Sequence, residues 1–259
     1  MSFSGDKTAA ASPAPNVVGN AAAPERSARG ELMGLLARTP IPQDELVHNL
    51  GLYLTRQTLS RILYMADLYR QIVEVHGVVM EFGVRWGQNL SLFSALRGIH
   101  EPFNYNRKIV GFDTFAGFPA VDAADGTAVR AGDYGVTEGF ERHLDQVLQI
   151  HESLSPVSHI KKYELVKGDA TVTIGDYLGR QPETIVALAY FDFDIYKPTK
   201  ACLEAVLPRM AKGGILAFDE LNCPQFPGET LAVLETIGLQ RYPLRRSPLN
   251  PLCSYMRVE

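Results

Sequence analysis

From Gly77 onward the sequence alternates between short apolar runs of strand type and longer runs of helical type. Strands are expected at residues 78–82, 108–112, 163–166, 185–191 and 214–218. Helices are expected near residues 89–97, 138–154, 173–178, 200–210 and 228–237. This alternation predicts a doubly wound, Rossmann-like α/β fold, with a parallel sheet and helices on both faces. Two closely spaced strands, 240–244 and 252–258, end the chain without an internal repeat, unlike a dehydrogenase.

The first 76 residues have a different character. Residues 1–25 are rich in Ala, Pro, Ser and Gly, and we expect a mobile tail because they cannot bury enough surface to offset their ordering entropy. Residues 26–76 are mainly helical in pattern, with a wide apolar stripe, and Pro40 and Pro42 interrupt them. We expect this helical segment to cover a sheet edge or a subunit interface, leaving residues 77–259 as the α/β domain.

The composition argues against several classes of protein. Apolar residues make up 46% of the chain, enough for a substantial core, and the net charge of −4 without a dense basic run gives a nucleic-acid partner no support. The three scattered cysteines argue against a disulfide framework or a zinc knuckle. No signal peptide or run of about 20 apolar residues is seen, so we expect a cytoplasmic enzyme without a membrane partner.

The turn after the first expected strand has features of a ligand site. Gly83 and Gly87 permit a tight turn and close backbone approach to a ligand. Arg85 and Trp86 leave little room for a dinucleotide pyrophosphate, whereas an amino-acid-like ligand could use backbone N–H groups for its carboxylate and Glu81 for its ammonium group. An ordinary strand-to-helix turn is the alternative.

Two further acids follow the second and third expected strands. Asp113 is placed where a carboxylate can accept hydrogen bonds from vicinal ribose hydroxyls, although it could also cap a turn. Asp169 could bind an adenine amino group or cap the next helix. Together with the glycine turn, these signals at successive strand ends indicate a nucleoside site.

Four more acids come directly after the fourth and fifth expected strands: Asp192, Asp194, Asp219 and Glu220. Because parallel strands end at the same sheet edge, these carboxylates should converge and raise one another's pKa values. A hard divalent cation such as Mg²⁺ would relieve the repulsion. The alternative is that some of these acids cap helices or pair with Lys197 and Lys200.

Three segments resemble the macrocin O-methyltransferase family over about residues 60–259: the turn Glu81–Gly87, the run Asp113–Pro119 and the run Phe191–Tyr196. The family consists of class I methyltransferases that modify sugar hydroxyls in macrolide and related antibiotic biosynthesis. The resemblance implies a seven-stranded sheet, S-adenosylmethionine as methyl donor, Mg²⁺ or another divalent cation, a sugar-containing small-molecule acceptor and a homo-oligomer.

The resemblance also implies donor contacts, residue by residue. Glu81, Gly83 and Gly87 would contact the amino-acid end of S-adenosylmethionine. Asp113 would bind the ribose and Asp169 the adenine region.

For the acidic residues, the resemblance implies a metal and a base. Asp192, Asp219 and Glu220 would be metal ligands, and Asp194, with Asp192, would be catalytic, Asp194 as general base. The family commonly has Asp-Asp where this chain has Asp219-Glu220, so Asn222 is an alternative third ligand.

The expected chemistry follows from charge. A metal would lower the pKa of the acceptor hydroxyl and align it with the electrophilic methyl group, while Asp194 accepts the proton. Residues 116–135 and 221–228 are expected to form the acceptor pocket. Possible sugar contacts are Tyr134, Tyr196, Phe226 and His143, for each of which core packing or solvent exposure is the alternative. Alternatives are a catechol-type or acyl-carrier-type O-methyltransferase and, less favoured, a nicotinamide-dependent oxidoreductase.

Overall fold

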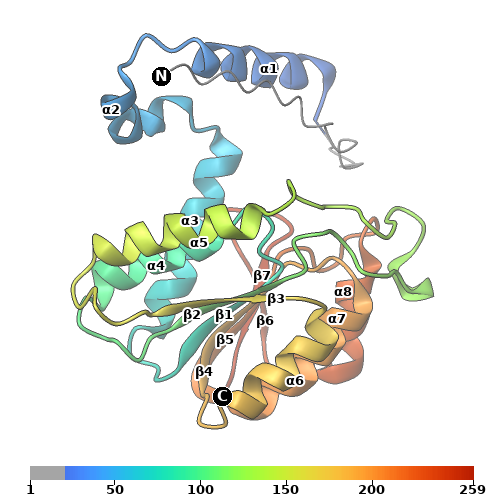
Figure 1. Ribbon diagram of the computed structural model, residues 1–259. Coiled ribbons are helices and arrows are strands. Elements are labelled where there is room, and N and C mark those ends of the chain that lie inside the picture. The colour runs from blue at the N-terminus through green and yellow to red at the C-terminus, as the bar shows by residue number, and fades with distance from the viewer. Residues whose placement is uncertain (1–20) are drawn as a thin grey trace.

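Seven strands form one sheet in the order β3-β2-β1-β4-β5-β7-β6. The computed structural model describes residues 21–259, and its strands are β1 (Val78–Phe82), β2 (Ile109–Asp113), β3 (Tyr163–Lys167), β4 (Val186–Phe191), β5 (Met210–Phe218), β6 (Leu244–Arg246) and β7 (Ser254–Arg257). β1 to β5 pair in parallel, whereas β7 pairs antiparallel with both β5 and β6. The prediction of a doubly wound, seven-stranded α/β sheet is therefore confirmed (Figure 1).

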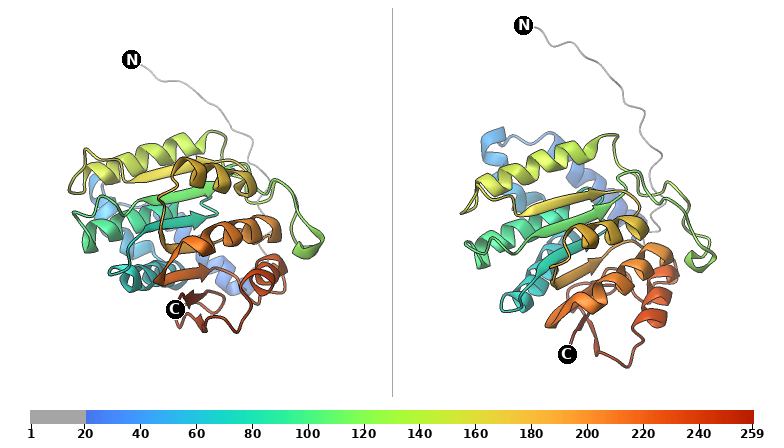
Figure 2. Two further views of the ribbon diagram at one scale, coloured as in Figure 1. Left: turned by 90° about the horizontal axis from the view of Figure 1, so that it is seen from below. Right: turned by 60° about the horizontal axis from the view of Figure 1, so that its bottom comes forward.

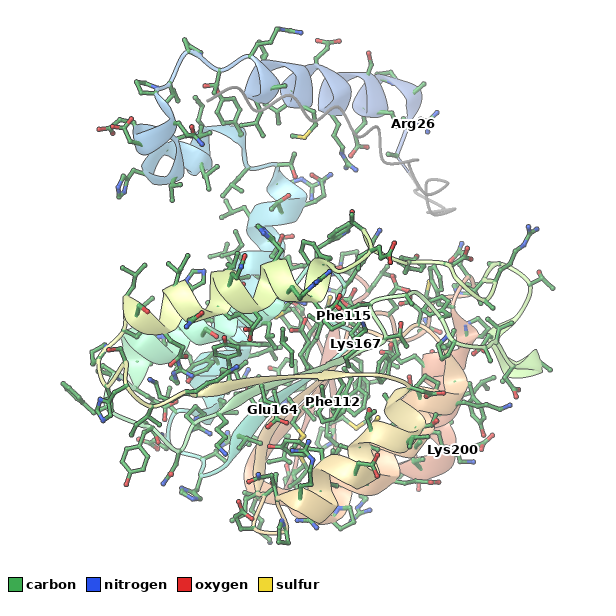
Figure 3. The ribbon with its side chains drawn as sticks, in the orientation of Figure 1. Arg26, Phe112, Phe115, Glu164, Lys167 and Lys200 are labelled. Atoms are coloured by element: carbon green, nitrogen blue, oxygen red, sulfur yellow. The ribbon has the colours of Figure 1, made fainter. Side chains whose placement is uncertain are left out.

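Helices cover both faces of this sheet. One face is covered by α3 (Arg56–Ile72), α4 (Gln88–His100) and α5 (Phe140–Ser153), and the other by α6 (Ala170–Arg180), α7 (Tyr196–Val206) and α8 (Pro227–Thr236). Figure 2 shows the second face from below, with α6 and α7 crossing the strands. Phe112 and Phe115 lie on opposite sides of the sheet and belong to the two separate core clusters (Figure 3).

A row of stacked phenylalanines fixes the register at the carboxyl ends of four strands. Phe82 stacks on Phe112 with ring centroids 5.0 Å apart and on Phe191 at 4.8 Å, and Phe191 stacks on Phe218 at 5.4 Å. The same residues are paired in the sheet. Each stacked pair contributes about 0.5–1.5 kcal/mol beyond its buried area. The residues that follow these rings are consequently side by side at the sheet edge: Gly83, Asp113, Asp192 and Asp219.

The N-terminal helices lie outside this core. α1 (Ala23–Ala37), α2 (Gln43–Leu46) and the 3₁₀ helix η1 (Val47–Tyr53) contain no buried residue. α1 stands apart from the sheet in Figure 1. The tail predicted for residues 1–25 falls mostly outside the described residues, and its last part, from Ala23, already belongs to α1. None of the helices within residues 21–259 is long and apolar enough to cross a membrane.

Several boundaries differ from the expected ones. α7 begins at Tyr196 rather than residue 200, because Pro198 in the first helical turn needs no N–H partner. It ends at Val206, where Pro208 starts a short 3₁₀ helix, η3 (Leu207–Arg209), and β5 then begins at Met210. β6 starts only at Leu244 and is exposed throughout, so the apolar pattern of the sequence did not predict its bounds. The acceptor loop holds one further 3₁₀ turn, η2 (Ala123–Asp125).

Candidate active site

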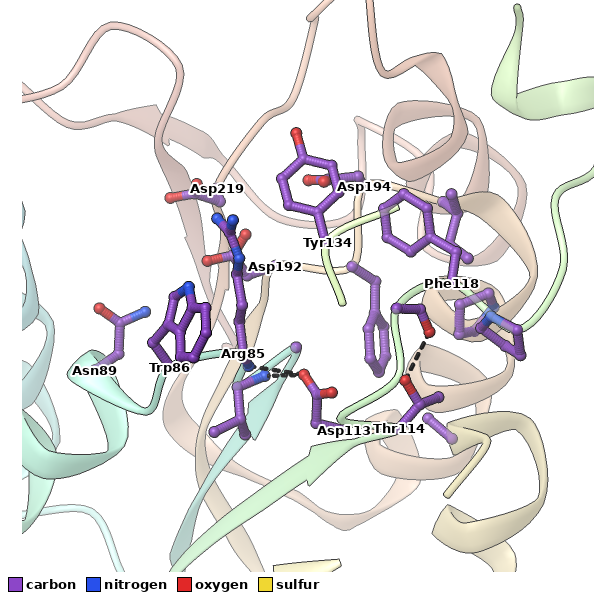
Figure 4. Close-up of a pocket in the computed structure, with 18 of the residues that line it drawn as sticks. Arg85, Trp86, Asn89, Asp113, Thr114, Phe118, Tyr134, Asp192, Asp194 and Asp219 are labelled. Carbon is purple, nitrogen blue, oxygen red and sulfur yellow. Dashed lines mark hydrogen bonds between the residues drawn. The ribbon is translucent and has the colours of Figure 1, made fainter. Parts of the chain in front are cut away.

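A cavity of about 440 Å³ opens at the carboxyl ends of the parallel strands, where the strand order reverses between β1 and β4. This switch point is the usual ligand crevice of an open α/β sheet. All predicted site residues line the cavity except Glu81 and Gly87: Gly83, Asp113, Asp169, Asp192, Asp194, Asp219 and Glu220. Figure 4 shows Asp192, Asp194 and Asp219 together near Tyr134, with Asp113 on the β1–α4 side.

The β1–α4 turn requires glycine at both predicted positions. Gly83 has φ of +96°, and a side chain there would collide with the backbone oxygen of Asp192. Gly87 has φ of +75° and precedes α4, where a side chain would collide with Leu144. The two glycines therefore bring the backbone of this turn against β4 and α5, close to the cavity.

Asp113 holds the same turn from the neighbouring strand. Its Oδ2 accepts hydrogen bonds from the backbone N–H groups of Val84 (2.8 Å) and Arg85 (2.7 Å), and its Oδ1 accepts one from Phe115 (2.5 Å). Asp113 thus determines the shape of the loop in addition to lining the cavity. A carboxylate has about four lone-pair sites, so an acceptor position remains for a ligand hydroxyl.

Asp169 lines the cavity and also caps a helix. It lines the cavity, and its Oδ1 accepts hydrogen bonds from the backbone N–H (2.9 Å) and hydroxyl (2.8 Å) of Thr171, capping α6. Asp169 therefore caps α6, which is one of the two roles that the sequence allowed. The contact with adenine stays a prediction.

Glu81 is a buried carboxyl in the middle of the sheet. Burial and, to a lesser degree, the nearby Asp192 raise its pKa well above the ordinary value, while Asn89 lowers it. Neither carboxyl oxygen accepts a well-formed hydrogen bond within the described residues. An unsatisfied buried acid of this kind costs a few kcal/mol unless it is neutral or meets a donor from a ligand.

The acidic residues share a cationic partner that the sequence analysis missed. Arg61 on α3 forms ion pairs with Asp219 (Nη2 to Oδ2, 2.7 Å) and Asp192 (Nη1 to Oδ2, 3.3 Å). Tyr190 donates a hydrogen bond to the other oxygen of Asp219 at 2.6 Å. Nothing in the helical pattern around Arg61 indicates a contact with residues more than 130 positions away, so this partner could be found only in three dimensions.

The lysines that the sequence offered as partners pair elsewhere. Lys197 forms an ion pair with Asp122 at 3.1 Å, and Lys200 forms one with Glu235 at 2.7 Å. Within residues 21–259, neither lysine forms an ion pair with the four predicted acids.

Burial and mutual repulsion govern the titration of these acids. The pKa of Asp192 is raised by burial and then by Asp219, and that of Asp194 by burial and then by Glu220. Burial, followed by repulsion from Asp219 and Asp192, raises the pKa of Glu220 to about 8. Asp194 also has a left-handed backbone with φ of +62°, a strained conformation that is concentrated at functional sites.

Glu229 adds a fifth acid to this region. It lies in the first turn of α8, is 0% exposed, and neither carboxyl oxygen has a hydrogen-bond partner in the described part of the chain. Burial and then Asp194 raise its pKa well above the ordinary value. In the sequence it resembles an ordinary first-turn glutamate, which favours the positive end of a helix dipole, so it gave no signal of burial.

The donor set partly fits a hard cation. Carboxylate oxygens suit Mg²⁺, and Glu220 Oε2 is buried without a hydrogen-bond partner in residues 21–259. The same range contains no group of three or more His, Cys, Asp or Glu side chains already arranged around a metal position, and Arg61 compensates two of the expected ligands. Asn222 is exposed and does not line the cavity, so Glu220 is the better placed candidate of the two.

Aromatic residues form the opposite wall. Tyr134 lies 5.2 Å from Phe118 and 6.4 Å from Phe226, measured between ring centroids. Of the predicted sugar contacts, Tyr134 lines the cavity, whereas Tyr196 donates a hydrogen bond to Glu235 away from it.

The seven-stranded sheet with a reversed β7 between β5 and β6, together with an acid-rich cavity at the carboxyl edge, defines a class I S-adenosylmethionine-dependent methyltransferase. The chain belongs to the macrocin-O-methyltransferase (TylF) family, whose sequence profile matches residues 56–230. It is accordingly an O-methyltransferase.

Solved structures agree with this assignment. The crystal structure of CalS11, a calicheamicin methyltransferase, has 44% sequence identity, covers 99% of both chains and superposes with a TM-score of 0.90. An apo structure of CalS11, described as a TDP-rhamnose 3'-O-methyltransferase, has 43% identity, covers 92% of this chain and 96% of its own, and gives a TM-score of 0.82. The O-methyltransferase NovP, at 16% identity, covering 77% and 79% of the two chains with a TM-score of 0.59, shares the fold. No curated protein matches the sequence.

Proposed function

We propose that the protein transfers the methyl group of S-adenosylmethionine to a hydroxyl of a deoxysugar in antibiotic biosynthesis. The sugar would be attached to a nucleotide or to a glycosylated natural product. The observation that carries this proposal is the 44% identity to CalS11 over 99% of both chains, a match that extends over the loops expected to form the acceptor pocket. CalS11 is described as acting on TDP-rhamnose, so a nucleotide-linked deoxysugar is the first acceptor to test.

The donor would lie along the carboxyl ends of β1, β2 and β3. Gly83 and Gly87 allow the turn to approach its methionine end, and the unsatisfied carboxyl of Glu81 suits its ammonium group. Asp113 keeps acceptor capacity for the ribose hydroxyls, and Asp169 lies at the cavity edge for the adenine.

The acceptor hydroxyl would lie beside Asp194. As the oxygen bonds to the methyl carbon and the carbon–sulfur bond breaks, the hydroxyl proton passes to the Asp194 carboxylate and S-adenosylhomocysteine leaves. A raised pKa makes Asp194 a stronger proton acceptor once it is ionised. The aromatic wall around Tyr134 would limit water at the reacting atoms.

Asp192, Asp219 and Glu220 would hold a divalent cation, with Arg61 as the competing counter-charge. Bound there, Mg²⁺ would supply the Lewis acidity that lowers the pKa of a hydroxyl.

Methyl transfer can be tested directly. The purified protein is incubated with S-adenosylmethionine carrying a ¹³C-methyl group and, separately, with TDP-rhamnose, a rhamnosylated glycoside and catechol. We expect a new ¹³C-methoxy signal on a sugar carbon, which should form at least about 100-fold more slowly in Asp194→Asn. Methylation of catechol alone would contradict the sugar assignment while preserving the enzyme class.

We further propose that a second copy of the chain covers the N-terminal helices. α1, α2 and η1 bury no residue, and their exposed apolar side chains would otherwise face water: Met33, Leu35, Val47, Leu50 and Leu52. A homo-oligomer would remove this surface from solvent.

A further inference from the structure

Two cationic side chains line the cavity, and they differ in their partners. Arg61 is engaged by Asp192 and Asp219. Arg85 forms no ion pair within residues 21–259, and its Nε is buried there without a hydrogen-bond partner. Arg85 is therefore a cavity cation whose hydrogen-bonding capacity the described protein does not use.

The position of Arg85 is fixed at both ends. Its backbone has φ of +47°, a conformation that costs about 1 kcal/mol or more for a residue with a side chain. Asp113 holds that backbone through the 2.7 Å hydrogen bond from the Arg85 N–H. At the other end, the guanidinium carbon lies 5.0 Å from the ring centroid of Tyr134. Figure 4 shows the residue beside Tyr134 and the carboxylates. Strain at a preorganised, unpaired cation indicates a ligand contact.

The charges around it restrict the ligand. The cavity is lined by six acids: Asp113, Asp169, Asp192, Asp194, Asp219 and Glu220. An anionic group that enters this cavity is repelled by whichever of these acids are ionised, and Arg85 is the lining cation that has no carboxylate partner within residues 21–259. The planar guanidinium offers a fork of N–H donors that matches a phosphate or carboxylate.

We infer that Arg85 is an anion-binding residue of the cavity. Its ligand is an oxyanion of a substrate, either a phosphate of a nucleotide-linked sugar acceptor or the α-carboxylate of S-adenosylmethionine. The first source rests on the proposed function; the second needs only the methyltransferase class. Arg85 then determines which acceptors or donors bind, without taking part in proton transfer.

Calorimetry on the metal-free full chain distinguishes the two sources. The probes are TDP, S-adenosylhomocysteine, and 5'-methylthioadenosine, which lacks the amino-acid end. The variants are Arg85→Gln and Arg85→Lys, and Arg130→Gln is the control because Arg130 is an exposed arginine on the loop of residues 116–135 and does not line the cavity. Loss of a charge-assisted hydrogen bond should weaken binding about 10- to 100-fold.

Each pattern of affinities has one meaning. If Arg85→Gln weakens TDP and leaves S-adenosylhomocysteine unchanged, the anion is the acceptor phosphate. If it weakens S-adenosylhomocysteine and leaves 5'-methylthioadenosine unchanged, the anion is the donor carboxylate. Arg85→Lys should retain part of the affinity, because it keeps the charge but loses the fork. Affinities equal to those of Arg130→Gln for every probe, with melting temperatures unchanged, would overturn the inference.

This test is independent of turnover. If the wild-type protein methylated no sugar, the proposed function would fail, but the donor-carboxylate result would still be measurable. Conversely, if the wild-type protein methylates a sugar and Arg85→Gln changes no affinity, the proposed function stands and only the role of Arg85 is refuted.

Discussion

The guanidinium of Arg61 lies 2.7 Å from a carboxylate oxygen of Asp219 and 3.3 Å from one of Asp192. A side chain from the helices that precede the sheet is therefore the counter-ion of acids at its carboxyl edge. The carboxylates have an internal cation before any metal binds, and a divalent ion would have to compete with Arg61 or displace it.

Replacing Arg61 tests this competition. Arg61→Gln leaves two carboxylates without their cation, so we expect the free energy of unfolding to fall by about 1–3 kcal/mol. If the acids also bind Mg²⁺, the ion should raise the melting temperature of the variant more than that of the wild type. Arg70→Gln is the control, because Arg70 is exposed on the same helix and pairs only with Asp67 in the described chain. Equal Mg²⁺ responses in all three proteins would argue against a cation site at these acids.

Substitution of Asp192 and of Asp194 should have different effects on metal binding and on the rate of methyl transfer. Asp192→Ala is expected to abolish turnover and weaken Mg²⁺ binding while S-adenosylhomocysteine still binds. Asp194→Asn should slow the chemical step about 10²- to 10⁴-fold without lowering metal affinity, since it removes only the proton acceptor. Single-turnover rates and calorimetry measure these effects. Loss of donor binding alone in Asp192→Ala would count against the metal assignment.

The third ligand can be assigned by a pair of variants. Glu220→Gln should weaken Mg²⁺ binding, because an amide cannot ionise to give the carboxylate that a bound cation would favour in the cavity, whereas Asn222→Ala should not. Titration of each purified variant with Mg²⁺ gives the comparison. If Asn222→Ala weakens Mg²⁺ binding and Glu220→Gln does not, Asn222 is the third ligand in place of Glu220.

Glu229 should make stability depend on pH in a direction opposite to that of most carboxyls. Its pKa is raised in the folded state, so the folded protein holds a proton that the unfolded chain releases above about pH 4.3. Stability is therefore lost as pH rises from there toward the folded pKa. Glu229→Gln cannot ionise, so its advantage over wild type should grow by at most about 1.4 kcal/mol per pH unit.

Glu235, a second glutamate on α8, is the control for the direction in which stability changes with pH. Lys200 and Tyr196 lower the pKa of the exposed Glu235, so the wild type should gain stability relative to Glu235→Gln as pH rises toward about 4.3, with no further change above that. Urea unfolding from about pH 3 to 8 measures both variants, with the effect of Glu235 at the acidic end and that of Glu229 above about pH 4.3. If the stability of wild type and of Glu229→Gln depends on pH in the same way, the pKa of Glu229 is not raised in the folded protein. The carboxyl would then have a hydrogen-bond or ionic partner in solution.

The exposed apolar helices predict an assembly. Val47→Glu and Leu52→Glu, at residues 71% and 67% exposed, should reduce the mass measured by light scattering, because a charge in a subunit contact is costly. Val172→Glu, at a residue 60% exposed on α6, should leave the mass unchanged. A wild-type protein that is already monomeric would contradict the proposed homo-oligomer.

Much of the fold and the site was predictable because both depend on local patterns. Apolar runs mark the five parallel strands, and parallel strands end at a shared edge, so Asp113, Asp192 and Asp219 could be placed together from sequence. The stacked row beginning at Phe82 keeps those ends level. Strand β6 was misplaced because its three residues are all exposed and only the first, Leu244, is apolar.

The rest could not be predicted because it depends on contacts between distant segments. Arg61 has the pattern of a helix residue near an apolar stripe, and only the packing of α3 on the sheet brings it to the acids. Glu229 looks like a solvated first-turn acid until α8 is packed. For Asp113, the position was right, but its hydrogen bonds to the Val84 and Arg85 backbone were not foreseen.

The place of Arg61 on α3 has a consequence for engineering. The family match begins at residue 56, which is also the first residue of α3. A fragment trimmed at residue 77, or a chimera joined there, would lose both a helix of the core and the charge that balances two acids. Exchange of catalytic modules between relatives should therefore use a junction upstream of Arg56.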